Sequence, residues 1–246
     1  MPRRPPRIFV AGIFGVGDVV EPAPDDARKL RIVLRARPGD AVEILDSSGR
    51  AYAAELIVER ETVRAHLRAE KTPQAHPTLR LSLAQGMPTG AKMDFVVEKA
   101  TELGVAQLVP FTSERTQAGD ARAGKIERWR RLAKGAAQQC GRPDVPVLDE
   151  PTPFSQVCAG FGMFDVALVA WELADGVPLR ERLPTLLAGA RSALIVIGPE
   201  GGLSHDEAQL AERSGGRPLS LGARILRTET AGLVACSAVL YASGNL

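Results

Sequence analysis

The chain of 246 residues is 45% hydrophobic and 24% charged, with a net charge of +2, which is the composition of an ordinary folded protein and excludes a disordered chain. Its three cysteines, Cys140, Cys158 and Cys236, form no Cys-x-x-Cys pair and no Cys/His cluster, which argues against a disulfide-rich scaffold and a zinc site. We therefore expect free thiols, a reducing compartment and no metal.

The N-terminal part is predicted to be a small all-β barrel. Strands are expected at residues 8–10, 41–45, 51–58 and 62–67, because these runs are separated by turn-forming segments such as Pro38-Gly39-Asp40. One helix is expected at about residues 25–34. Arg3, Arg4 and Arg7 precede an apolar stretch, as in a signal peptide, but glycines break that stretch and no small-residue cleavage site follows, so we do not expect secretion.

Residues 71–77 carry two prolines and no apolar periodicity, and we interpret them as a linker. Beyond it strands alternate with helices, which is typical of an α/β domain with a largely parallel sheet. Strands are expected at residues 79–84, 107–110, 165–170 and 193–197, and helices at residues 92–103 and 125–140. The uncharged tail 230–246 is shorter than the ~20 strongly apolar residues that span a bilayer, so it predicts a packed helix and no membrane segment.

Positive charge is concentrated between residues 115 and 142. The basic residues there are Arg115, Arg122, Lys125, Arg128, Arg130, Arg131, Lys134 and Arg142, against only Asp120 and Glu127. Such a run indicates either a surface for nucleic acid or a solvated helix face, and the charge alone does not decide between them.

A glycine-rich loop at residues 198–202 follows a buried strand and precedes a helix. Ligands bind at this position in open α/β sheets, because glycine lets backbone amides approach them closely. The helix opens with Ser204-x-x-Glu207, a capping box, so we assign these two residues structural roles. Glu200 fits no capping pattern, and it is either a catalytic candidate or an exposed loop carboxylate.

The signatures of several other enzyme classes are missing. There is no phosphate-binding Gly-x-x-x-x-Gly-Lys-[Ser/Thr] loop, and Gly12, Gly15 and Gly17 have the wrong spacing for a dinucleotide fingerprint. Phosphoryl transfer and hydride transfer are therefore disfavoured. The histidines fall in expected surface or linker positions, which disfavours triad hydrolysis.

A second loop, at residues 221–231, allows the sequence to be compared with a specific family. Gly198-Pro199-Glu200-Gly201-Gly202 followed by Leu221-Gly222-x-x-Ile225-Leu226-Arg227-x-Glu229-Thr230-Ala231 resembles the RsmE family, which makes N3-methyluridine in small-subunit ribosomal RNA. Further matches in the same order are Arg7-Ile8-Phe9, Val33-Leu34-Arg35, Gly39-Asp40, Lys92-Met93-Asp94, Lys99-Ala100-x-Glu102-Leu103-Gly104-Val105, Pro110, Ser113-Glu114-Arg115 and Gln139-x-Gly141-Arg142 with Pro146. The chain departs from the family at Lys29 and Ile32, where a His and an Arg are frequent, while Arg31 is shifted by one position.

The resemblance implies a fold and a function. It implies a SPOUT methyltransferase domain at residues 78–246 with a C-terminal trefoil knot, preceded by a PUA-like RNA-binding β-barrel at residues 1–72 and a linker at residues 73–77. The expected activity is S-adenosylmethionine-dependent methylation of uridine N3 in small-subunit (16S) ribosomal RNA. The implied protein is a cytoplasmic homodimer that acts on ribosomal RNA or the small ribosomal subunit. Two alternatives remain open, namely a SPOUT enzyme with another RNA target and a non-enzymatic RNA-binding assembly factor.

The resemblance also assigns site residues. Arg227 is expected to stabilise negative charge on the uracil, with Glu229 or Glu200 as proton acceptor, whereas a structural salt bridge is the alternative role of Arg227. The cofactor is expected against Leu173, Ile197, Gly198, Pro199, Gly202, Leu221, Gly222, Ile225, Leu226, Thr230 and Ala231. RNA contacts are expected from Arg7, Lys29, Arg31, Arg35, Lys92, Arg115 and Arg142. Thr228 and Thr230 are expected to be capping and packing residues, and Trp129 and Trp171 to lie in the core or a dimer interface rather than to stack bases.

Overall fold

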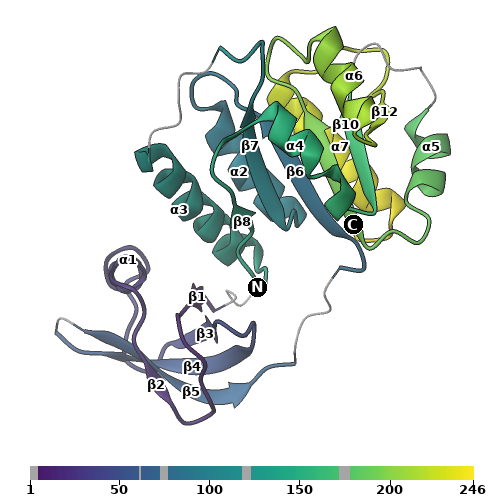
Figure 1. Cartoon of the computed structure of the whole chain (residues 1–246). Coiled ribbons are helices and arrows are strands. Elements are labelled where there is room, and N and C mark those ends of the chain that lie inside the picture. Colours follow the sequence, from purple (N-terminus) through teal and green to yellow (C-terminus); the bar gives the residue numbers. More distant parts are fainter. Residues whose placement is uncertain (1–4, 61, 73–76, 118–122, 172–177) are drawn as a thin grey trace. The chain divides into compact units, whose positions relative to one another are not determined.

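The computed structural model describes residues 5–60, 62–72, 77–117, 123–171 and 178–246. Within it the chain divides into two compact units, one of residues 1–76 with 137–144 and the other of residues 77–136 with 145–246 (Figure 1). Of the linker expected at residues 73–77, all but Pro77 lie outside the described residues.

The N-terminal unit contains a five-stranded sheet in the order β1-β3-β4-β5-β2. β1 (Arg7–Phe9) pairs in parallel with β3 (Ala41–Leu45), and β3, β4 (Ala51–Val58) and β5 (Val63–Glu70) pair antiparallel. These four strands confirm the sequence expectation. β2 (Val19–Val20), which pairs with β5, was not expected, because two valines beside Gly17 and Asp18 give no periodic signal.

The predicted helix of this unit has two parts. α1 (Pro24–Arg28) has proline in its first turn and continues as the π-helix η1 (Lys29–Val33). After it, Arg35 adopts a left-handed backbone conformation with φ 52°, and the Ala36 amide donates to the Leu30 carbonyl at 3.0 Å. Leu30 is fully buried in the unit's core with Ile8, Ile44 and Tyr52, which anchors the helix on the sheet.

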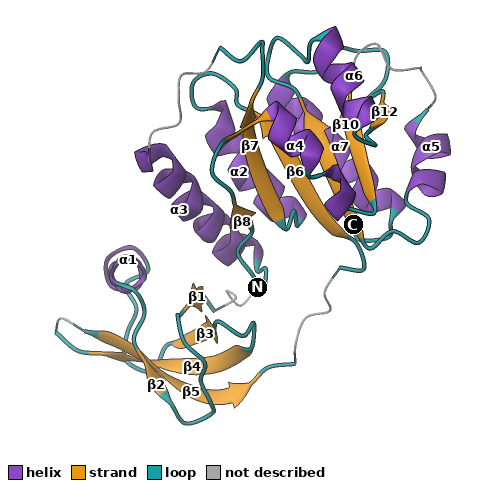
Figure 2. Ribbon diagram, viewed as in Figure 1, coloured by secondary structure: helices purple, strands orange, loops and turns teal. Residues whose placement is uncertain are grey.

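The second unit is built on a parallel sheet in the order β12-β10-β11-β6-β7-β8, with β9 also paired to β7 (Figure 2). Its strands are β6 (Arg80–Gly86), β7 (Gln107–Thr112), β8 (Val147–Leu148), β9 (Thr152–Pro153), β10 (Val166–Ala170), β11 (Ser192–Ile197) and β12 (Arg217–Leu219). Every pairing among them is parallel, as the alternation of strands and helices predicted.

The helices of this unit are α2 (Lys92–Leu103), α3 (Ala123–Cys140), α4 (Phe154–Ala159), α5 (Leu179–Leu186), α6 (His205–Arg213) and α7 (Thr228–Ala242), with a 3₁₀ turn at Phe161–Met163. The last residues of α3, 137–140, belong to the N-terminal unit. α2 has the predicted bounds and ends at Gly104, whose φ of 98° suits glycine. The capping box of Ser204 and Glu207 at α6 is confirmed. α4 and α5 were not expected, since one is short and the other contains Pro184.

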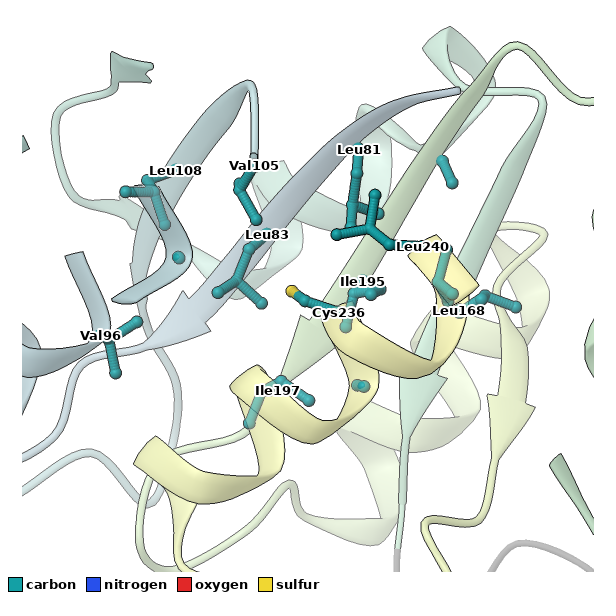
Figure 3. Close-up of a cluster of buried hydrophobic side chains, with 14 of the residues drawn as sticks. Leu81, Leu83, Val96, Val105, Leu108, Leu168, Ile195, Ile197, Cys236 and Leu240 are labelled. Carbon is teal, nitrogen blue, oxygen red and sulfur yellow. The ribbon is translucent and has the colours of Figure 1, made fainter. Parts of the chain in front are cut away.

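Helices cover both faces of the sheet. α2, α3 and α7 pack on one face, where Leu83, Val96, Ile195 and Cys236 form part of the core (Figure 3). α4 and α6 pack on the other face against alternate strand residues such as Leu194 and Val196. Side chains of the central strands therefore point alternately to the two faces, and both faces are buried and apolar.

The three cysteines are free thiols. Burial raises the pKa of Cys236 to about 12, and burial, followed by the charge of Glu207, raises that of Cys158 to about 12. Both thiols are therefore packing residues without nucleophilic character at neutral pH. Among the described helices, none has the length and hydropathy needed to cross a membrane.

Candidate cofactor and catalytic site

The candidate site lies where β6, β11 and β12 end. Because the strands of this sheet are parallel, their carboxyl ends meet at one edge, which is where ligands bind in open α/β sheets. Three segments leave this edge: residues 87–91 before α2, residues 198–203 before α6 and residues 220–227 before α7. The chain thus brings together both loops that the sequence singled out.

The loop of residues 198–203 is folded too tightly for side chains at its glycines. A Cβ on Gly86 would lie 2.4 Å from the Pro199 nitrogen, and one on Gly198 would lie 3.0 Å from the Gly202 carbonyl carbon. A Cβ on Gly201 would lie 2.9 Å from the Cβ of Arg115. Gly86 and Gly198 are required by the close approach of backbone atoms and Gly201 by the side chain of Arg115, while Gly202 has a positive φ of 69°.

Glu200 joins this loop to the segment before α2. Its Oε1 accepts hydrogen bonds from the Thr89 amide at 2.9 Å, the Thr89 hydroxyl at 2.8 Å and the Lys92 ammonium at 2.7 Å. Partial burial works against its charged form, but the bonds from Lys92 and Thr89 outweigh it and hold the pKa of Glu200 at about 2. At neutral pH the residue is a fixed anion and a weak base.

Two further contacts hold the same loop from the side of β7. The guanidinium of Arg115 donates to the Gly201 carbonyl at 3.1 Å. Glu207 accepts from the Glu114 amide at 2.8 Å through one oxygen and from the Ser204 amide at 2.9 Å through the other. The capping residue Glu207 therefore also ties α6 to the segment after β7.

The segment of residues 220–227 is open to solvent, and its backbone makes few hydrogen bonds with the described residues. Gly222 has a φ of 104°, and apart from its chain neighbours no atom of the described residues lies within 4 Å of the position of a Cβ. Leu221 and Leu226 pack against the core. The backbone amides of residues 223–226 donate to no residue that the structure describes. Unpaired amides beside apolar side chains suit a ligand held by backbone groups and an apolar surface, as S-adenosylmethionine would be.

An open pocket of about 620 Å³ adjoins this segment, lined by Lys92, Phe95, Ile225, Leu226, Arg227, Glu229 and Thr230. The Arg227 side chain is exposed and forms no hydrogen bond or ion pair with any described residue. Glu229 has a buried Oε2 with no hydrogen-bond partner among the described residues. The pocket therefore combines two cations with a carboxylate whose hydrogen-bonding capacity is unused.

Most of the expected cofactor and catalytic residues lie at this edge of the sheet. Ile225, Leu226, Arg227, Glu229 and Thr230 line the pocket, as does Lys92, which was expected to contact RNA. Gly198, Pro199, Glu200 and Gly202 form the neighbouring loop. The side chains of Ile197 and Ala231 are buried, so only their backbone could face a ligand. Leu173 lies outside the described residues.

The cations expected to bind RNA divide into two groups. Several already have partners: Lys92 bonds Glu200, Arg115 bonds Gly201, Arg7 bonds Glu43 and the Gly141 carbonyl, Lys29 bonds Gln138, and Arg142 pairs with Asp144. Arg31 and Arg35 are exposed, and Arg31 has only a 3.3 Å bond to the Arg60 carbonyl. These long-range partners could not be read from the sequence.

Two residues of the site region, Phe95 and Gln85, were not singled out from the sequence. Phe95 lines the pocket although it is 46% exposed, an unusual position for a phenyl group on an amphipathic helix. Gln85 is fully buried at the end of β6 and bonds Thr228 at the start of α7. A glutamine inside an apolar strand was the available signal. Trp129 lies in the core, as expected, and donates to Asp94 at 3.0 Å.

Comparisons with known proteins agree with this geometry. Residues 74–240 match the model of a family described as an RNA methyltransferase domain. The chain is 33% identical over 216 residues to the ribosomal RNA small subunit methyltransferase E of Bacillus subtilis, covering 85% of this chain and 84% of the relative.

Two solved structures are similar along nearly the whole chain. A ribosomal RNA small subunit methyltransferase E from Neisseria gonorrhoeae bound to S-adenosylmethionine has a TM-score of 0.87, 30% identity and coverage of 97% of this chain and 98% of that one. A methyltransferase from Legionella pneumophila in complex with the same cofactor has a TM-score of 0.86, 29% identity and coverage of 98% of both chains.

Proposed function

The chain belongs to the RNA methyltransferase family that includes the ribosomal RNA small subunit methyltransferases E, and from this premise we propose that it methylates N3 of a uridine in small-subunit ribosomal RNA. The methyl donor of this family is S-adenosylmethionine. The observation that carries the proposal is the pocket in which Arg227 and Glu229 stand beside the open segment of residues 220–227.

Methylation of uridine N3 poses a definite chemical problem. When bound, S-adenosylmethionine supplies a methyl group that its sulfonium sulfur makes electrophilic. The N3–CH₃ bond forms as the S–CH₃ bond breaks, and the imide proton of N3 must pass to a base. The protein must therefore orient the uracil, stabilise the negative charge that develops on its carbonyl oxygens and accept the proton.

Arg227 is suited to stabilise that charge. Its guanidinium is exposed in the pocket and is not engaged by a carboxylate among the described residues, which disfavours the structural salt bridge considered above. A planar guanidinium can donate two parallel hydrogen bonds to a carbonyl edge, which an ammonium cannot. Lys92 also lines the pocket, but its ammonium is paired with Glu200 at 2.7 Å.

Glu229 is the better candidate for the base. Glu200 is held ionised by three hydrogen bonds, and its pKa of about 2 makes it a poor proton acceptor. Glu229 lines the pocket, and one of its oxygens has no partner among the described residues. An unsatisfied carboxylate oxygen gains most from a donor such as the uridine imide.

The cofactor would lie between residues 198–202 and residues 221–226. Gly198, Pro199 and Gly202 would contribute backbone groups from one side, and Leu221, Gly222, Ile225 and Leu226 would do so from the other. The backbone of Ile197, Thr230 and Ala231 would complete the cradle, with Leu173 as a further member. This placement is supported by the free amides of residues 223–226 and by the open space at Gly222.

We further propose the SPOUT architecture with a C-terminal trefoil knot. Its support is that α7 follows the open segment and returns to pack on β6 and β11, beside the loop of residues 198–203. The five-stranded N-terminal sheet would serve as a PUA-like RNA-binding domain at residues 1–72, with the exposed Arg31 and Arg35 among the residues that contact RNA. Arg7, Lys29, Arg115 and Arg142 would contact RNA only by exchanging or sharing their present partners.

We also propose a homodimer. α7 packs beside α2 yet leaves Val234 38% and Tyr241 76% exposed, and Phe95 of α2 is half-exposed as well. A second copy would cover these side chains. A ribosomal substrate would place this dimer in the cytoplasm.

The test is a methyl-transfer assay with labelled S-adenosylmethionine, using naked small-subunit ribosomal RNA and assembled small subunits in parallel. Mass spectrometry of the digested RNA identifies the modified nucleoside, and RNA from a strain lacking the protein, before and after complementation, identifies the position in the cell. N3-methyluridine that depends on the protein supports the proposal. A different methylated nucleoside would indicate another RNA target, and cofactor binding without transfer would indicate an assembly factor.

A further inference from the structure

We infer that Gln85 and Thr228 are positioning residues that set the spacing between the two loops of the cofactor site. They form a buried chain of hydrogen bonds that runs from the Gln85 amide to the Thr228 hydroxyl and on to the Gly198 carbonyl. The inference rests on the proposed function, because it concerns the same cofactor site, but neither residue belongs to the set assigned above.

The direction of the hydrogen bonds follows from the chemistry of the three groups. The Gly198 carbonyl can only accept, so the Thr228 hydroxyl donates to it, at 2.6 Å. That hydroxyl has a single hydrogen, so it accepts from the Gln85 amide nitrogen, at 2.7 Å. Thr228 is only 6% exposed, and its hydroxyl does not cap α7, which has no side-chain cap. The Thr228 hydroxyl therefore connects the start of α7 to the loop of residues 198–203.

Gln85 is held in a single orientation. Its amide nitrogen also donates to the Gly86 carbonyl at 3.1 Å, so both amide hydrogens are used. Its Oε1 is buried without a partner among the described residues and faces α7, where a Cβ on Gly232 would lie 2.9 Å away. Rotating the amide by half a turn would break both hydrogen bonds and place an NH₂ group against the helix. The Gln85 side chain thus fixes the distance between the end of β6 and the start of α7.

The chain of hydrogen bonds links segments that are far apart in the sequence. Gly198 begins one loop, Thr228 directly follows the other, and Gln85 precedes Gly86, which contacts Gly198 and Pro199. Among the described residues, the bond from Thr228 to Gly198 is the only hydrogen bond between residues 198–203 and residues 220–228. A methyl group in place of the hydroxyl would leave the Gly198 carbonyl and one hydrogen of the Gln85 amide without a partner, and the loops would move to satisfy them.

The test is Thr228→Val, which keeps the shape of the side chain and removes the hydroxyl. Isothermal titration with S-adenosylmethionine should show a Kd raised by about tenfold or more, as expected for a lost buried hydrogen bond. The KM for RNA and the kcat at saturating cofactor should change by less than about threefold, because the residue touches neither RNA nor the reacting atoms. Thr228→Ser keeps the hydroxyl and should restore the wild-type Kd to within about twofold.

Thr101→Val is the matched control. Thr101 is a fully buried threonine whose hydroxyl bonds the Val97 carbonyl of its own helix at 2.7 Å. It should lower the melting temperature in the same way as Thr228→Val but leave the Kd for S-adenosylmethionine unchanged. Gly232→Ala, which pushes the Gln85 amide from the other side, should raise the Kd without touching the hydroxyl.

Several outcomes would overturn the inference. One is a folded Thr228→Val protein that binds the cofactor as the wild type does, and another is an equal rise in Kd in Thr101→Val. If Thr228→Val does not fold, wild-type cofactor affinity in Gly232→Ala would count against the inference, and a raised Kd would support it. A wild-type protein that binds S-adenosylmethionine but does not methylate uridine would contradict the proposed function and leave the inference intact, because the inference is tested by the Kd for S-adenosylmethionine.

Discussion

Glu200→Gln tests whether Glu200 is a structural anion or a catalytic base. The substitution keeps the shape of the side chain and an oxygen that can accept from Thr89, but it removes the charge that pairs with Lys92 at 2.7 Å. We expect a less stable protein whose catalytic pH dependence near neutrality is unchanged.

The magnitude follows from the environment of the carboxylate. A pKa of about 2 in place of 4.5 corresponds to roughly 3 kcal/mol if taken at face value. The side chain is 28% exposed and its partner Lys92 is 36% exposed, so water screens the pair. We therefore expect Glu200→Gln to lower the free energy of unfolding by about 1–2 kcal/mol at pH 7.

The sign of the pH dependence is fixed by the direction of the pKa change. The pKa of Glu200 is lower in the folded protein than in the unfolded chain, so its stabilising contribution is present above pH 4.5 and is lost as the pH falls toward 2. Gln does not titrate in this range. The difference in stability between wild type and variant should therefore shrink steadily from pH 5 to pH 2.

Urea denaturation followed by tryptophan fluorescence measures the difference in unfolding free energy between wild type and variant. The signal reports on the second unit, because the chain's only two tryptophans, Trp129 and Trp171, both lie in that unit together with Glu200. Glu98→Gln is the matched control, because Glu98 pairs with Lys99 on the exposed surface of α2, and the substitution should change the free energy of unfolding far less than Glu200→Gln does. A variant as stable as wild type, or a stability difference independent of pH, would refute the reasoning. Loss of an ionisation from the kcat profile would make Glu200 the base.

Four further predictions concern the pocket and the assembly. Arg227→Ala should lower the single-turnover methylation rate by about a hundredfold while leaving the Kd for S-adenosylmethionine nearly unchanged, and Arg227→Lys should rescue only partly; a normal rate at saturating RNA would contradict its role. Glu229→Gln should lower the same rate by about a hundredfold or more without loss of RNA binding, whereas a wild-type rate would exclude Glu229 as the base. Gly222→Trp should abolish cofactor binding measured by titration, and retained affinity in a variant with an intact circular dichroism spectrum would argue against the placement of the cofactor. Light scattering should give twice the mass of the 26.2 kDa chain, and an active monomer would refute the dimer.

Local patterns predicted the elements better than they predicted the partners of side chains. α2, β3 and β4 have the expected bounds because apolar periodicity, turn residues and Gly104 act within a few residues of each other. The π-helical turn at Lys29–Val33 and the helix that contains Pro184 depend on tertiary packing that overrides local preference, so the sequence pattern did not reveal them.

The site shows the same division. The glycines and the motif at residues 221–231 predicted which edge of the sheet holds the site. The physical roles of these residues depend on tertiary contacts that the sequence pattern does not show. Arg115 and Lys92 were expected to contact RNA, yet they bond Gly201 and Glu200, which lie 86 and 108 residues away in the sequence. Spacing in a sequence does not encode such pairs, since they form only when separate strands meet at one edge.

The contacts of residues 198–203 separate the structural members of the site from the chemical ones. Glu200 bonds Thr89 and Lys92, the Gly201 carbonyl accepts from Arg115, and the Gly198 carbonyl accepts from Thr228, so each segment around the loop is attached to it. Groups whose hydrogen bonds are already satisfied have little left to offer a substrate, and moving them would cost the contacts that they make. Arg227 and Glu229 differ, because both line the pocket and, among the described residues, neither the Arg227 guanidinium nor the buried Oε2 of Glu229 has a hydrogen-bond partner. A preorganised site needs both kinds of residue: a loop that does not move when substrate arrives, and polar groups whose hydrogen bonds are completed only by the reacting base.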